Sequence, residues 1–302
     1  MKALVIGAGG YLGRRVRLAL AKHGVEVVGA DISIIPGLVE RAVDIRLPEQ
    51  SFALLHREAP DVVIDLAYML MAASSAGPHP AVHLNILGTN GVFDASATLG
   101  IARVIYASSA AVYGDQKGHG TKTLDEESAA VPVTVYGHMK RFNEVMAEHY
   151  NSKSSTRFVS LRISDLHGRG KTGSFAPMDT IVRAVGEAES VALPWTADHE
   201  TSFIHVDDAA ESIAQLAIAK APAHTIYNTG GKCLSMAQLA AIGKELAGID
   251  VSCSPPPGAQ LLHVSRVSGS RLLDEFPVQR RSPAEWMALE VAEKRSRTGV
   301  AI

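Results

Sequence analysis

The chain opens with a short apolar run that ends in a cluster of glycines. Residues 2–6 read Lys-Ala-Leu-Val-Ile, glycines follow at positions 7, 9, 10 and 13, and residues 14–20 continue with helical spacing. This order predicts a strand, a tight turn and a helix, with backbone N–H groups and the helix N-terminus facing one spot. A pyrophosphate fits there because glycines let the backbone approach it closely. The turn therefore favours a dinucleotide-binding fold.

The spacing of these glycines narrows the type of turn. The common dinucleotide fingerprint would place glycines at 7, 9 and 12, but residue 12 is Leu. Gly7, Gly10 and Gly13 fit a spacing that is one residue wider at the first step. The chain holds 26 glycines, so an ordinary strand-to-helix turn is the alternative on spacing alone. We expect Gly7, Gly10, Tyr11, Leu12 and Gly13 to contact the cofactor.

The second predicted strand, residues 25–30, ends in Asp31. A carboxylate at this place accepts hydrogen bonds from the adenosine ribose hydroxyls and repels a 2′-phosphate. Asp31 therefore favours NAD over NADP. Arg14 and Arg15 offer the opposite interpretation, since a basic side chain beside the turn can hold a 2′-phosphate, although both also fit a solvated helix face.

Strands and helices alternate along the first half of the chain. Further strands are predicted at 41–44, 61–67, 103–107 and 158–162. This alternation indicates a parallel sheet covered by helices on both faces. We predict an α/β fold with a doubly wound parallel sheet. Residues 1–165 plus 201–230 form an NAD-binding Rossmann domain, and residues 166–200 plus 231–302 form a smaller substrate-binding lobe.

Two strand ends place further residues at the cofactor. Asp44 and Ile45 follow the third strand and are expected near the adenine, and Leu66 and Ala67 end the fourth strand beside the cofactor. The serines, glycine and prolines of residues 68–80 predict a mobile segment.

Composition excludes several classes of protein. The 302 residues include 29 basic and 31 acidic side chains, for a formal charge of −2, which gives no sign of a nucleic-acid or membrane surface. The two cysteines, Cys233 and Cys253, are too few for a disulfide framework and lack metal-ligand spacing. No apolar run reaches about 18 residues. We expect a soluble cytoplasmic protein that acts on a small molecule without a metal.

One pair of residues carries the predicted chemistry. Tyr136 and Lys140 lie four residues apart on a predicted helix, so both project from one face. A phenol, with an ordinary pKa of about 10, is a poor base at neutral pH. A nearby ammonium and an oxidised nicotinamide favour the phenolate. Tyr136 can then accept a proton from a substrate hydroxyl, and Ser109, at a strand end, can hydrogen-bond the same oxygen. A lone Tyr-x-x-x-Lys pair also fits a solvated helix face.

Together these motifs resemble the extended short-chain dehydrogenase/reductase family, which includes nucleotide-sugar epimerases and dehydratases. The resemblance covers residues 1–165 and 203–230. The motifs that carry it are Gly7-x-x-Gly10-x-x-Gly13, Asn85-x-x-Gly88-Thr89, Ser109, Val112-Tyr113-Gly114, Tyr136-x-x-x-Lys140, Leu161-Arg162 ahead of Gly168-x-Gly170, Phe203-Ile-His205-Val-Asp207-Asp208-Ala209 and Tyr227-Asn228-x-Gly230.

The resemblance implies a role for each matched residue. Ser109 and Tyr136 would polarise the substrate oxygen, Lys140 would hold the nicotinamide ribose, and Asn85 would support Lys140 through water. It also implies a homodimer, in which the helix predicted at about 80–99 and the helix of Tyr136 pack against their copies in the partner.

Departures from the family pattern narrow the function. Family dehydratases carry an Asp-Glu pair where this chain has Ala110-Ala111, so loss of water is not expected. Nucleotide-sugar enzymes place an Arg where Thr201 stands and another where Pro256 precedes Pro257-Gly258. Neither Thr nor Pro can hold a diphosphate as an arginine fork does. The basic residues that might replace them are Lys171, Arg183 and Arg266.

Three further positions stand out in the sequence. The family strand end His-Leu-Ala-Ala is altered to Asp65-Leu-Ala67-Tyr68, and the sequence leaves the role of Tyr68 open. His205 is expected to be packed and hydrogen-bonded. His167, in a predicted loop at 165–176, fits substrate binding and a structural role about equally well.

The leading hypothesis is an NAD-dependent dehydrogenase that oxidises a secondary alcohol, or reduces the ketone, of a small polar substrate such as a sugar or sugar derivative. The second is a sugar or nucleotide-sugar epimerase with tightly bound NAD. A non-catalytic NAD sensor is the third, and the Ser109, Tyr136 and Lys140 set argues against it.

Overall fold

Seven parallel strands form the central sheet. The computed structural model describes residues 1–171, 175–256 and 264–298, and the sheet order is β10-β6-β5-β4-β1-β2-β3. Its strands are β1 (Lys2–Ile6), β2 (Glu26–Asp31), β3 (Arg41–Ala42), β4 (Val62–Asp65), β5 (Arg103–Ser109), β6 (Arg157–Ile163) and β10 (Ile226–Asn228). The chain order reverses between β1 and β4, and ligands bind outside the carboxyl ends of strands at such a point.

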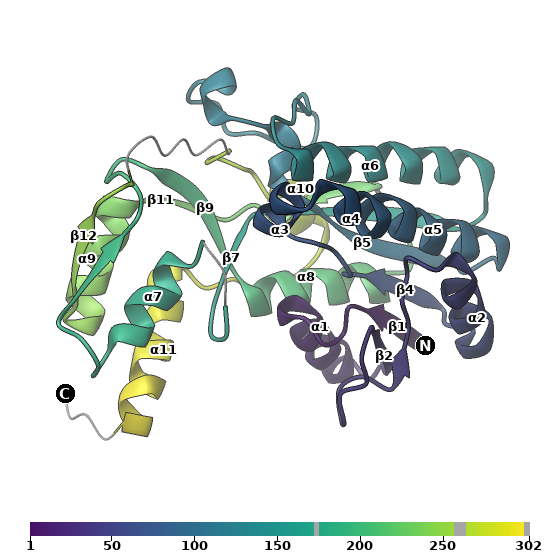
Figure 1. The fold of residues 1–302 in the computed structure, drawn as a ribbon, viewed down its shortest axis with the longest axis horizontal. Coiled ribbons are helices and arrows are strands. Elements are labelled where there is room, and N and C mark those ends of the chain that lie inside the picture. Colours follow the sequence, from purple (N-terminus) through teal and green to yellow (C-terminus); the bar gives the residue numbers. More distant parts are fainter. Residues whose placement is uncertain (172–174, 257–263, 299–302) are drawn as a thin grey trace.

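Helices cover both faces of this sheet, as Figure 1 shows. Along β4, Val62 and Ile64 join the core on one face and Val63 joins the core on the other, as strand alternation requires. One face carries α1 (Tyr11–Lys22), α8 (Val206–Ile218) and α10 (Ser270–Glu275), and the other carries α2 (Pro48–Glu58), α5 (Thr89–Thr98) and α6 (Val135–Lys153). The predicted doubly wound α/β fold is therefore confirmed.

A smaller group of elements lies beside the carboxyl ends of the sheet (Figure 1). Its strands are β7 (Asp165–His167), β8 (Ser190–Leu193), β9 (Glu200–His205), β11 (Lys232–Ser235) and β12 (Asp250–Cys253), and its helices are α7 (Pro177–Ala184), α9 (Met236–Ala247) and α11 (Pro283–Thr298). β9 lies between β7 and β11, and β12 pairs with β8. Side chains that include Met178, Ile181, Trp195 and Met236 form a separate core here.

Two local predictions were wrong. Residues 68–80 are largely helical, as α3 (Met71–Ala76) and the start of α4 (Pro78–Val82). The predicted loop at 165–176 begins with the strand β7, which pairs with β9. Both segments gain regular structure from partners distant in sequence, which local composition does not reveal.

The helix predicted at about 80–99 runs through three consecutive elements. It comprises α4, a π-helical turn η1 (His83–Gly88) and α5. Such π turns commonly accompany functional sites, and this one carries Asn85.

Two absences hold for the described ranges. No helix there is both long and apolar enough to cross a lipid bilayer. Cys233 and Cys253 are free thiols, and no group of three His, Cys, Asp or Glu side chains in the same ranges is arranged to hold a metal ion.

Candidate active site

The glycine turn after β1 is packed against the end of β4. Gly7 has a φ of +81°, and a Cβ on it would lie 2.8 Å from the backbone nitrogen of Ala67. A Cβ on Gly13 would lie 2.1 Å from the carbonyl oxygen of Gly7. Neither position can therefore take a side chain without moving backbone. Gly10 is the N-cap of α1 and leaves the helix N-terminus uncovered by any capping side chain.

Asp31 lies at the end of β2, beside this turn. Its carboxylate accepts hydrogen bonds from the backbone N–H of Gly9 at 2.9 Å and of Ile32 at 2.7 Å. Arg14 donates to the carbonyl of Gly9, and Arg15 pairs with Asp207 at 3.4 Å. Both arginines have partners within the protein, which weakens the case for a 2′-phosphate.

The other predicted cofactor residues follow the carboxyl ends of β3 and β4 in the same sheet. Leu66 and Ala67 touch the turn through their close approach to Gly7. Ile45 is buried, whereas Asp44 forms an ion pair with Arg46 at 2.5 Å. Their contacts with the adenine and phosphates remain predictions.

Ser109 and Tyr136 meet at the end of β5. Ser109 is the last residue of that strand, and its Oγ accepts a hydrogen bond from Ala111 N–H at 3.1 Å, capping η2 (Ala110–Tyr113). Tyr136 stands in the first turn of α6, whose N-cap is Thr134. Burial raises the pKa of Tyr136 to about 12, although its hydrogen bond with Ser109 lowers the pKa. The two hydroxyls can therefore contact one substrate oxygen.

Lys140 is buried beneath these residues. Its Nζ donates to the carbonyl of Ala107 at 2.5 Å and lies 3.2 Å from the centre of the Tyr68 ring. The centre of the Tyr136 ring is 5.6 Å from the same Nζ. Burial lowers the pKa of Lys140, and the carboxylates of Asp65 and Glu144 oppose that shift. The nearest aromatic ring to the ammonium is thus Tyr68 rather than Tyr136.

Asp65 and Tyr68 are site residues whose roles the sequence left unassigned. Asp65 ends β4, is 4% exposed and accepts a hydrogen bond from Ala67 N–H at 3.2 Å. Burial raises its pKa, and the charge of Lys140 lowers it. The Tyr68 ring meets Tyr136 edge to face, with ring centres 5.6 Å apart. The only sequence signal was the departure of this strand end from the family pattern.

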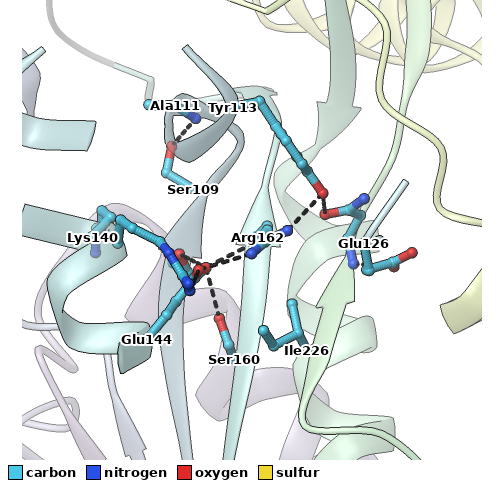
Figure 2. Close-up of polar contacts among 12 residues, drawn as sticks. Ser109, Ala111, Tyr113, Glu126, Lys140, Glu144, Ser160, Arg162 and Ile226 are labelled. Atoms are coloured by element: carbon cyan, nitrogen blue, oxygen red, sulfur yellow. Dashed lines mark hydrogen bonds and ion pairs between the residues drawn. The ribbon is translucent and has the colours of Figure 1, made fainter. Parts of the chain in front are cut away.

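A buried ion pair joins α6 to β6 behind the site (Figure 2). The carboxylate of Glu144 accepts hydrogen bonds from Nε and Nη2 of Arg162, both at 2.8 Å. Arg162 also donates to the Tyr113 hydroxyl at 2.8 Å, and that hydroxyl donates to Asn228 at 2.9 Å. Breaking one member of such a pair costs about 3–5 kcal/mol because the other charge stays buried. The network therefore fixes α6, which carries Tyr136 and Lys140, against β6, and Ser108 of the neighbouring β5 joins it by donating to Glu144 at 2.7 Å.

Asn85 contacts the chain next to Tyr68 rather than Lys140. Its Oδ1 accepts from Met69 N–H at 2.8 Å, and its Nδ2 donates to the Met69 carbonyl at 3.0 Å and to Ser74 Oγ at 3.2 Å. These contacts explain why residues 68–76 are ordered as α3 and its lead-in. Support of Lys140 by Asn85 through water remains a prediction.

The two positions that lack family arginines differ in what surrounds them. Thr201 is buried and donates a hydrogen bond to Asp165. Arg266, a candidate replacement, forms two-point contacts with Glu200 at 2.8 and 3.1 Å. Pro257 and Gly258, which follow Pro256, lie outside the described residues.

The other two candidate replacements line a cavity of about 350 Å³ between α7, α11 and residues 169–171. Arg183 donates to the carbonyl of Lys171 at 3.2 Å. Lys171 is itself largely buried, which lowers its pKa, and its Nζ lies 5.7 Å from the centre of the Tyr11 ring. Tyr11 in turn donates to the carbonyl of Gly168 at 2.7 Å. Of the three candidates, Lys171 is the one in contact with the first turn of α1.

The sequence profile of the NAD dependent epimerase/dehydratase family matches residues 3–230. The chain belongs to this family. The extended short-chain dehydrogenase/reductase membership predicted from the motifs is thereby confirmed. This family member is 25% identical over 285 residues to a UDP-glucose 4-epimerase of Corynebacterium glutamicum, a match that covers 85% of the chain and 84% of the relative.

Two solved structures share its fold over nearly their whole length. A UDP-glucose 4-epimerase of Thermus thermophilus in complex with NAD has a TM-score of 0.83 and 24% identity, covering 98% of this chain and 99% of that chain. A holo L-threonine dehydrogenase of Cupriavidus necator has a TM-score of 0.88 and 22% identity, covering 97% and 99%. At these identities the comparison establishes the fold alone.

NAD is the cofactor of this family, and the residues of this enzyme fit it. The turn at Gly7 and Gly13 leaves no room for side chains, and it joins β1 to the N-terminus of α1, where backbone N–H groups can bind phosphate. Asp31 presents a carboxylate at the end of β2, where the adenosine ribose is held in such folds.

The two histidines singled out in the sequence are both buried. His205 accepts a hydrogen bond from Asp207 N–H at 3.2 Å and stacks on Trp286 with ring centres 3.6 Å apart, which confirms a packed, hydrogen-bonded histidine. His167 ends β7, and its ring centre is 5.1 Å from that of His205. Burial lowers the pKa of His167 to about 3, so it is neutral at ordinary pH.

Proposed function

We propose that this enzyme is an NAD-dependent dehydrogenase that oxidises a secondary alcohol, or reduces the corresponding ketone, of a small polar substrate such as a sugar or sugar derivative. One observation favours this function over that of a nucleotide-sugar enzyme: the positions that would bind a diphosphate already have partners. Thr201 is hydrogen-bonded to Asp165, and Arg266 is paired with Glu200. A guanidinium that already has a two-point carboxylate partner is not free to clamp a diphosphate.

Each of the three side chains has a separate role in the proposed reaction. NAD, when bound, supplies the carbon that takes up or returns hydride. Ser109 and Tyr136 hold the substrate oxygen, and in oxidation Tyr136 accepts its proton as general base. Lys140 supplies positive charge that favours the phenolate and would hold the nicotinamide ribose. In the reverse direction Tyr136 donates the proton.

The test is a substrate screen read by NADH absorbance. Purified enzyme with NAD is mixed with sugars, sugar acids, 3-hydroxy amino acids such as L-threonine, and nucleotide sugars, after a thermal-shift screen has ranked them. A dehydrogenase gives NADH in proportion to a small alcohol consumed. Turnover confined to nucleotide sugars would overturn the proposal.

A sugar or nucleotide-sugar epimerase is the second candidate. UDP-glucose 4-epimerases recur among the relatives of the chain, and the same three side chains would serve. An epimerase interconverts its sugars without net NADH and often purifies with cofactor bound. Chromatography of the sugar after incubation, together with the absorbance of the protein as purified, separates the two candidates.

We also propose a homodimer in the cytoplasm. Apolar side chains on η1 and α6 are exposed in the single chain, among them Leu87 at 52%, Phe142 at 45% and Val145 at 45%. A partner that covered them would remove apolar surface from water. Sedimentation at micromolar concentration tests this, and a monomer there would reject it.

A further inference from the structure

The ammonium of Lys140 is buried with few partners. Lys140 is 3% exposed, and its Nζ donates a hydrogen bond to the carbonyl of Ala107 at 2.5 Å. A buried charge is costly unless hydrogen bonds and opposite charge compensate it. The remaining N–H groups of Nζ face the Tyr68 ring, whose centre is only 3.2 Å away.

Tyr68 is fixed in this position from two sides. The side-chain amide of Asn85 hydrogen-bonds both the backbone N–H and the backbone carbonyl of Met69, the next residue along the chain. The ring itself meets Tyr136 edge to face at an interplanar angle of 88°. The Tyr68 hydroxyl is buried and has no hydrogen-bond partner in the part of the chain that the structure describes. The contact that matters here is therefore made by the ring face and not by the hydroxyl.

Asp65 is the carboxylate left to compensate Lys140. Glu144 lies one helical turn from Lys140, but its oxygens are engaged by Arg162 at 2.8 Å and by Arg141 at 3.2 Å. Asp65 has no basic hydrogen-bond partner in the described ranges, and its Oδ2 is buried without any hydrogen bond there. Asp65 pairs across the sheet with Tyr106, the residue before the Ala107 whose carbonyl accepts from Lys140 Nζ. At this place the charge of Lys140 lowers the pKa of Asp65.

We propose that Tyr68 and Asp65 are positioning residues for Lys140: the ring face holds the ammonium by a cation–π contact, and the carboxylate keeps it charged. The inference rests on the proposed roles of Tyr136 and Lys140 and deepens them. A charged Lys140 favours the phenolate of Tyr136, so loss of either neighbour makes Tyr136 harder to deprotonate. Tyr68 and Asp65 thus set the pH at which the base becomes active.

The sign of the effect follows from the groups that face this cluster. Asp65 from β4 and Glu144 from α6 raise the pKa of Lys140, while burial lowers it. Asp165 from β7 raises the pKa of Tyr136. Removal of Asp65 or of the Tyr68 ring face lowers the pKa of Lys140, and the phenol of Tyr136 then loses a stabilising charge. The rising limb of activity against pH moves to higher pH.

The experiment measures the protonation of Lys140 directly. Enzyme containing lysine labelled with ¹³C at Cε is titrated by NMR, and Lys140→Arg assigns the resonance. Tyr68→Leu and Asp65→Asn are expected to lower the pKa of Lys140 by about one unit, a tenfold change in protonation, as loss of a desolvated cation–π contact or a nearby charge should do. Tyr68→Phe keeps the ring face and should titrate as the parent does.

Asp61→Asn is the matched charge control, because Asp61 is exposed and bonds the backbone nitrogen of Lys2 at the far end of β4. It should leave the Lys140 titration in place. If Tyr68→Leu does not fold, Tyr68→Met removes the ring face with a longer, unbranched side chain that adapts to the space left by the ring. An unchanged Lys140 titration in the Tyr68 and Asp65 variants overturns the inference. The titration needs no substrate, so this result is separate from failure of the proposed reaction, which Tyr136→Phe tests.

Discussion

At the turn after β1 the site is made of backbone, whereas at the end of β4 and on α6 it is made of buried side chains. Gly7 and Gly13 act by having no Cβ, and the N-terminus of α1 supplies N–H groups. Lys140, Asp65 and Tyr68 act through charge and ring contacts that burial strengthens. The glycine turn is therefore sensitive to added side-chain volume, and the second end is sensitive to both volume and charge.

The largest effect is expected at the reacting end. Tyr136→Phe removes the hydroxyl that we propose as the acid–base group, and general acid–base groups contribute about 10²–10⁴ in rate. We expect kcat to fall by about a thousandfold while NAD binding, measured by calorimetry, stays within a factor of about two. Substantial residual turnover would remove Tyr136 from the acid–base role.

A side chain added in the glycine turn should lower the free energy of unfolding. In Gly13→Ala the new Cβ meets the carbonyl oxygen of Gly7, and overpacking of this kind costs about 1–3 kcal/mol. Urea unfolding should show a loss near the upper end, because the obstacle is backbone, together with weaker NAD binding. Gly118→Ala is the control, since a Cβ there has nothing within 4 Å. Equal stability of the two variants would break the contrast.

His167, the last residue of β7, should make the stability of the fold depend on pH. The pKa of His167 is lowered from 6.5 to about 3 in the folded chain, so its neutral form stabilises the fold fully above about pH 6.5. This contribution falls by up to about 1.4 kcal/mol per pH unit as pH drops from about 6.5 towards 3. The melting temperature of His167→Gln should depend less on pH over this window than that of the parent. His149→Gln is the control, because His149 is exposed, and it should follow the parent. Parallel curves for His167→Gln and the parent would contradict the assignment.

The smallest effect concerns the choice of cofactor. Asp31→Ala removes a carboxylate that repels a 2′-phosphate and can bond the ribose, interactions worth about 1.5–3 kcal/mol each when charged. The preference for NAD over NADP should fall by about tenfold or more, measured as the ratio of kcat/KM values. An unchanged ratio would mean that Asp31 does not face the ribose.

Several features could not be foreseen because they depend on contacts between distant residues. The order of residues 68–76 depends on Asn85, and the strand β7 exists through its pairing with β9. The sequence placed Lys140 beside Tyr136 by helical spacing. Its ammonium, however, contacts Ala107 on β5 and Tyr68 in the segment after β4. Burial then shifts pKa values in ways that residue type alone does not indicate.

The sequence by itself determined the fold class and the cofactor, and it predicted the members of the catalytic set. Glycine spacing, strand and helix periodicity, and a tyrosine and lysine four residues apart are local properties, so the chain carries them before it folds. The tertiary structure decided which carboxylate and which ring surround Lys140, and that Thr201 and Arg266 are already engaged. These are properties of burial and of long-range contact, and they exist only once β4, α6 and the smaller lobe lie against one another.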